Sequence, residues 1–169
     1  VSLNAGETRT VTFNPGNTPG LRVLNPRVWW PFTMGGQPMY NASLWATVGG
    51  VVSDSASTTF GVREITSSRV NGGGRQFVVN GKPFLVRGGG WASDLFLRTN
   101  VRNIEDQLNL TKSMNLNTVR LEGKPENDEF YDIADRLGIM ILTGWECCSA
   151  WEKYSSFNAE RNRVAVVGN

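Results

Sequence analysis

The chain has 169 residues, of which 40% are hydrophobic and 19% are charged, and its formal net charge is +2. The hydrophobic content is typical of a globular protein, whereas the charged content is below the usual value of about 25%. The scattered Lys and Arg residues leave no basic stripe for a nucleic acid. No apolar run is long enough to cross a membrane. The absence of histidine excludes His-based triads, most zinc sites and a histidine general base. We expect no metal or other cofactor, no nucleic-acid partner and no membrane partner.

Residues 1–66 have the pattern of a β domain. From residue 40 to residue 48, apolar and polar side chains alternate, which predicts a strand with one buried face. Fewer strands are recognisable than the about seven of a complete immunoglobulin-like sandwich, so we predict a partial one. The aromatic stretch at residues 26–31 is interpreted as packing at a sandwich edge or between domains, with a ligand platform as the alternative.

The chain changes pattern between residues 65 and 94. Residues 65–75 include three consecutive glycines and are interpreted as a flexible connector. Asn80 and Gly81 separate two short apolar runs and form the pair that a tight hairpin with two positive φ angles prefers. Pro83 limits the second run to an edge of its sheet. We place the domain boundary between residues 66 and 67.

After residue 94 the sequence alternates helix and strand. Asn103 is the predicted N-cap of a first helix, and residues 116–121 form a buried strand. A second helix is predicted to begin at Pro125 and to end at Gly138, followed by a strand at 139–142. The order β-α-β-α-β with short links is typical of a parallel sheet with right-handed crossovers.

Acidic and tryptophan side chains follow the three predicted parallel strands: Asp94 with Trp91, Glu122, and Glu146 with Trp145. In parallel α/β folds, ligands bind beyond the carboxyl ends of the strands. Tryptophan faces and several acids suit a sugar ring. They favour a cationic sugar, because neighbouring carboxylates repel one another unless a cation lies among them. We predict that these five residues bind the substrate.

Arg120 completes the predicted binding set. It lies two residues before Glu122, so an ion pair within the sheet is the alternative to a binding role for both. A stand-alone carbohydrate-binding module and a small nucleotide-binding domain are alternative functions, the latter disfavoured because no complete phosphate motif is present. Asn41 and Asn109 fit the glycosylation sequon and are compatible with an extracellular, secreted protein.

Several segments resemble successive landmarks of the family 2 glycoside hydrolases; they lie at 60–63, 79–84, 87–88, 117–120 and 130–138. Within that family, three further segments are similar to the exo-β-D-glucosaminidase branch, which removes glucosamine from the non-reducing end of chitosan; they lie at 88–98, 120–124 and 144–148.

The resemblance implies an immunoglobulin-like sandwich followed by a (β/α)8 TIM barrel, so that residues 1–66 end the sandwich and residues 67–169 begin the catalytic barrel. It also implies retaining hydrolysis by two carboxylates about 5 Å apart. The family places these after the fourth and seventh barrel strands, so we expect no catalytic residue in this chain and no activity from it alone.

The implied partners are chitosan or chitooligosaccharides and the remainder of the polypeptide. Asp94 and Glu146 are then the candidates for holding the glucosamine ammonium group. A β-mannosidase-type enzyme of the same family remains the alternative activity.

Overall fold

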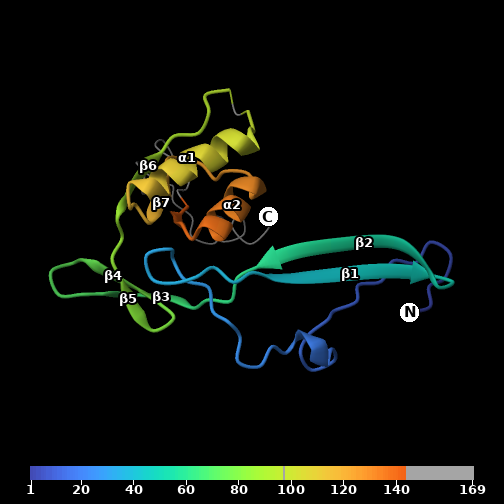
Figure 1. Ribbon diagram of the computed structural model, residues 1–169. Helices are drawn as coiled ribbons and strands as arrows, with labels where there is room; N and C mark the ends of the chain where they lie inside the picture. The colour runs from blue at the N-terminus through green and yellow to red at the C-terminus, as the bar shows by residue number, and fades with distance from the viewer. Residues whose placement is uncertain (97, 144–169) are drawn as a thin grey trace, which may run out of the picture.

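The computed structural model describes residues 1–96 and 98–143, and its strands form three separate sheets (Figure 1). Residues 1–39 are irregular apart from a short 3₁₀ helix, η1 (Pro19–Leu21). None of the helices in the described ranges has the length and apolar character needed to cross a membrane.

The first sheet is a long antiparallel hairpin of β1 (Tyr40–Val48) and β2 (Val51–Phe60). The predicted strand at residues 40–48 is confirmed, but its buried face is not. Only Tyr40 and Ala42 of β1 are half-buried, and apolar side chains such as Leu44 are exposed. The reason is that no second sheet covers the hairpin in the described part of the chain, which therefore contains no complete two-sheet sandwich.

The second sheet is an antiparallel meander of β3 (Ile65–Arg69), β4 (Arg75–Val79) and β5 (Lys82–Phe84). The predicted hairpin turn is confirmed, with φ of 47° at Asn80 and 76° at Gly81, and Pro83 lies in the edge strand. The prediction of a flexible connector at residues 65–75 is wrong, because residues 65–69 pair along their whole length with β4. The proposed domain boundary falls inside β3 and stays a prediction.

The third sheet is parallel and consists of β6 (Gly88–Trp91), β7 (Thr118–Leu121) and β8 (Met140–Leu142). Two helices, α1 (Val101–Ser113) and α2 (Asp128–Leu137), form the crossovers and lie next to each other (Figure 1). The predicted order β-α-β-α-β is confirmed. The main buried core lies between this sheet and the two helices; its residues are Ile104, Leu108, Val119, Leu121, Phe130, Ile133, Ala134 and Ile139.

The helix ends differ from the predicted ones. α1 begins directly after Asn100, whose side chain accepts the backbone N–H of Asn103 at 3.1 Å, so Asn103 is the capped residue and not the cap. Two asparagines three residues apart fit the same pattern, and the first takes the cap. α2 begins after Asn127 and not at Pro125, because the Asn127 side chain accepts the N–H of the third helical residue. Gly138 ends α2 with φ of 78°, as predicted.

Trp29 joins the segment before β1 to α2. Its ring is fully buried, and its Nε1 donates to the backbone carbonyl of Asp135 at 2.7 Å. The guanidinium of Arg63 lies 4.5 Å from the Trp29 ring centroid and pairs with the Asp135 carboxylate at 3.0 Å. Burial raises the pKa of Asp135 in spite of Arg63. The predicted packing role of the aromatic stretch is thus confirmed for Trp29.

Candidate functional site

Trp91 ends β6 on the side of the sheet that carries the helices. Its ring packs edge-on against Phe130, with centroids 4.9 Å apart, and its Nε1 donates to Glu126 Oε1 at 3.1 Å. It is half-buried against the main core. Much of the aromatic surface that we predicted for a ligand is therefore in contact with α2.

Arg120 and Glu122 lie toward the opposite face of the sheet. Arg120 is exposed and alternates along β7 with the buried Val119 and Leu121. The guanidinium of Arg120 donates to the Glu122 carboxylate, so the ion pair that we held as the alternative forms. Both side chains are about half exposed, at 58% and 48%. An exposed pair contributes at most about 1 kcal/mol, so it can rearrange around a ligand at small cost.

A hollow of about 230 Å³ lies on this same face. The glycines of β6 form one wall, and Arg120, Thr118 and Leu142 form the other. The absence of side chains on residues 88–90 keeps the hollow open. Of these glycines, Gly90 lies against the Arg120–Glu122 pair: a Cβ added to it would lie 3.3 Å from Glu122 Oε1.

Asp94 lies in the loop after β6 and is already paired. Arg98 donates to it twice, from Nη2 to Oδ2 at 2.9 Å and from Nε to Oδ1 at 3.2 Å, and the Phe96 N–H donates to Oδ1 at 2.9 Å. The hydrogen bond from Arg98 is the main cause that lowers the pKa of Asp94 to about 2. Asp94 is therefore ionised at neutral pH, and an ammonium ligand has to share it with Arg98.

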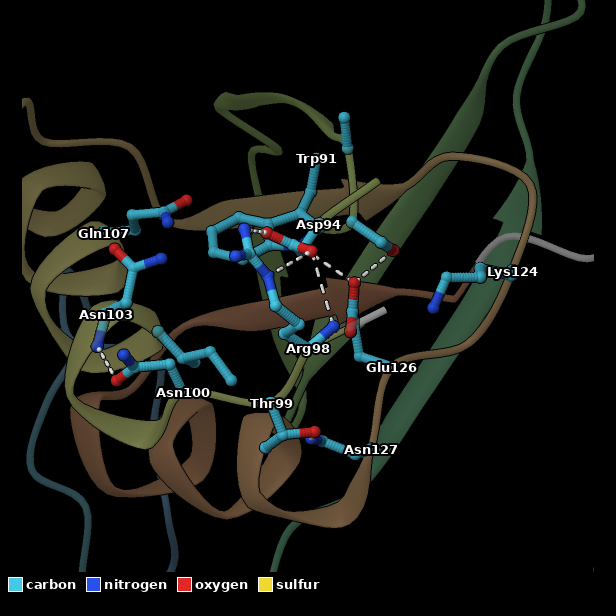
Figure 2. A pocket seen from close by; sticks show the side chains of 13 residues that line it. Trp91, Asp94, Arg98, Thr99, Asn100, Asn103, Gln107, Lys124, Glu126 and Asn127 are labelled. Atoms are coloured by element: carbon cyan, nitrogen blue, oxygen red, sulfur yellow. Dashed lines mark hydrogen bonds and ion pairs between the residues drawn. The ribbon is translucent and has the colours of Figure 1, made fainter. Parts of the chain in front are cut away.

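Asp94 and Trp91 border a cavity of about 200 Å³ between the β6–α1 and β7–α2 loops. Figure 2 shows the Asp94 carboxylate against the Arg98 guanidinium, with Glu126 facing them from the second loop. The structure thus brings Trp91 and Asp94 together, whereas Arg120 lies at the separate hollow, with Glu122 paired to it. Trp145 and Glu146 lie outside the described residues.

Glu126 is a site residue that the sequence analysis missed. The predicted helix start at Pro125 would place Glu126 in the first helical turn, whereas it precedes α2 and accepts from Trp91 and from the Ser93 hydroxyl. No local pattern signals these contacts. Within residues 1–96 and 98–143, no three His, Cys, Asp or Glu side chains are grouped so that they could hold a metal ion.

Comparison with known proteins identifies the family. Residues 70–166 match the family described as "Glycosyl hydrolases family 2, TIM barrel domain", and residues 2–63 match "Glycosyl hydrolases family 2". The chain belongs to the family 2 glycoside hydrolases. The parallel sheet with α1 and α2 is accordingly part of a family 2 TIM barrel. The cavity lies beyond the carboxyl ends of β6 and β7, and the hollow runs along the sheet.

Individual members of family 2 are similar over most of the chain. It is 51% identical to an exo-β-D-glucosaminidase of Streptomyces avermitilis over 90% of its length, and 37% identical to a mannosylglycoprotein endo-β-mannosidase of Lilium longiflorum over 73%. The crystal structure of Amycolatopsis orientalis exo-chitosanase CsxA superimposes with a TM-score of 0.72 at 51% identity, over 79% of this chain. The chain spans only 17%, 13% and 16% of these three proteins, respectively.

Proposed function

We propose that the chain is part of an exo-1,4-β-D-glucosaminidase that removes glucosamine from the non-reducing end of chitosan or chitooligosaccharides. The observation that carries the proposal is the 51% identity to the Streptomyces exo-β-D-glucosaminidase over 90% of the chain. The lily mannosidase, at 37% over 73%, makes a β-mannosidase-type activity the second candidate. A polymeric substrate of this kind favours an extracellular enzyme, which we also propose.

We assign the described site residues to substrate binding and not to bond cleavage. Arg120 borders the open hollow, and its exposed pair with Glu122 can open so that either side chain contacts a sugar. Asp94 offers a second anionic contact beside Trp91. Trp145 and Glu146 keep the same proposed role, on sequence grounds alone.

The proposed mechanism is retaining, with one carboxylate as acid/base and a second as nucleophile, about 5 Å apart. The family resemblance assigns both to the fourth and seventh strands of the barrel, which are not among the described strands. The contribution of the present residues is to bind the aminosugar, because interactions that are equally strong in the ground state and in the transition state lower KM without changing kcat.

Kinetics of a full-length enzyme that contains this chain test the proposed substrate. We expect kcat/KM for p-nitrophenyl β-D-glucosaminide to exceed that for the β-D-mannoside and the β-D-glucoside by at least about tenfold, because a carboxylate that pairs with a substrate ammonium has no such partner in a sugar that lacks it. Nuclear magnetic resonance of the first-formed product should show the β anomer. A preference for the mannoside would replace our proposal by the second candidate, and an α product would refute the retaining mechanism.

Asp94→Asn tests the ammonium contact. We expect glucosamine binding to weaken about tenfold, or about 1.4 kcal/mol, and glucose binding to change less than about threefold. The reason is that the substitution removes the anion and leaves Arg98 uncompensated beside an ammonium group. Isothermal titration of both sugars measures this, with Asp106→Asn on the exposed side of α1 as the matched control. Equal losses for both sugars would contradict the assignment.

A further inference from the structure

Two adjacent residues of the β7–α2 loop hold the β6–α1 loop, residues 92–100, at its two ends. At the start, Glu126 Oε1 accepts the Trp91 Nε1–H at 3.1 Å and the Ser93 hydroxyl. At the end, Asn127 Nδ2 donates to Thr99 Oγ1 at 2.7 Å. Figure 2 shows Glu126 facing Trp91 and Asn127 beside Thr99. We call these contacts the Glu126–Asn127 clamp.

Both clamp residues are themselves fixed. The Asn127 Oδ1 caps α2 by accepting the Phe130 N–H at 3.2 Å, so its amide nitrogen points to Thr99 from a rigid helix start. Thr99 directly precedes Asn100, the cap of α1. Glu126 is half-buried, and its Oε1 accepts from two donors. The clamp therefore ties the β6–α1 loop to the starts of both helices.

Between the two clamped ends, the described contacts of the loop are local. Asp94 pairs with Arg98 and accepts from Phe96, both within the loop. The side chains of Leu95 and Phe96 at its tip are 94% and 77% exposed, so apolar packing against the rest of the described chain does not hold them. Among the described residues, the clamp therefore supplies the side-chain hydrogen bonds that join this loop to the β7–α2 loop.

We propose that Glu126 and Asn127 are positioning residues, which hold the β6–α1 loop so that Asp94 and Trp91 border the cavity in a fixed arrangement for the sugar. This inference rests on the proposed function. A loop that binds the sugar equally in the ground state and in the transition state affects KM and leaves kcat unchanged. Loss of the clamp should therefore raise KM alone.

Glu126→Leu in the full-length enzyme removes the acceptor at nearly the same size. We expect faster hydrogen–deuterium exchange in residues 92–100, a KM for p-nitrophenyl β-D-glucosaminide that rises about tenfold, and a kcat within about twofold of the original. Glu126→Gln keeps an acceptor oxygen for Trp91 and Ser93. It should therefore keep the exchange rate and KM close to those of the unmodified enzyme. Glu129→Leu, which removes an exposed acid in the first turn of α2, is the matched control and should leave both unchanged.

Unchanged exchange in the Glu126→Leu enzyme would overturn the clamp, and faster exchange with unchanged KM would overturn the positioning role. If that variant fails to fold, Thr99→Val decides by the same two measurements, since it removes the acceptor at the other end and leaves the α2 cap intact. An unmodified enzyme that does not hydrolyse the glucosaminide would refute the proposed function and with it the role toward that sugar, while exchange would still decide whether the clamp holds the loop.

Discussion

Gly88→Ala is expected to separate β6 from β7 and to destabilise the parallel sheet by about 3 kcal/mol or more. A Cβ at this position would lie 1.8 Å from the backbone oxygen of Thr118 and 2.7 Å from its carbonyl carbon. These are backbone atoms of the residue that pairs with Gly88, so they cannot move aside without breaking the pairing. The effect should appear as a lower unfolding temperature of the full-length enzyme and as faster amide exchange in both strands.

Gly89→Ala is the matched control. The two glycines are neighbours in β6, and neither has a positive φ angle, so alanine removes the same backbone freedom at both. A Cβ on Gly89 meets no heavy atom of the described residues within 4 Å. We expect it to change stability by less than about 1 kcal/mol. Equal losses for the two variants would show that the contact with Thr118 is not what requires glycine.

The glycine run also shows where sequence reasoning reached its limit. Three consecutive glycines at a strand end, residues 88–90, are open to the interpretation of backbone that approaches a ligand closely. In the structure Gly88 approaches the backbone of β7, and Gly90 faces Glu122. Composition indicates that a close approach occurs, but the partner depends on strand spacing and register, which a single sequence does not specify. The wall that these glycines contribute to the hollow agrees with the ligand interpretation without testing it.

The order of the elements in the barrel part was predictable because the apolar periodicity is strong there. Phe130 and Ile133 recur at helical spacing and are buried on one face of α2, and Gly138 marks its end. The first residues of the two helices were harder to predict, because several residues near each helix start satisfy the same capping pattern. In the hairpin β1–β2 the alternation predicted the strand correctly but not its burial, which depends on segments that pack against it.

The candidate site divides into local and non-local contacts in the same way. Asp94 and Arg98 are four residues apart, and Arg120 and Glu122 are two apart, so both pairs can be proposed from the sequence. The contact of Glu126 with Trp91 joins residues 35 positions apart through two different loops. Only the folded arrangement of these loops reveals it.

Trp29→Ala is expected to cost about 3–5 kcal/mol of unfolding free energy in the full-length enzyme. The ring is fully buried, and an added Cβ on Gly61 would lie only 2.9 Å from it, so the surroundings are closely packed. Removal leaves a cavity, takes away the donor to the Asp135 carbonyl and removes the face on which Arg63 lies. Thermal unfolding and amide exchange at the end of α2 measure the loss.

Trp29→Phe separates the two contributions, since it keeps most of the ring and loses the N–H, and it should cost only about 1–2 kcal/mol. A loss as large as that of alanine would show that the hydrogen bond, and not ring burial, holds this contact. The pH dependence gives a second readout. Because burial raises the pKa of Asp135, the folded state binds its proton more tightly, and stability falls as pH rises from the usual carboxyl pKa of 3.8 through the raised value. Trp29→Ala exposes Asp135 to water, so this decline should become smaller; an unchanged decline would mean that Trp29 does not shield the carboxylate.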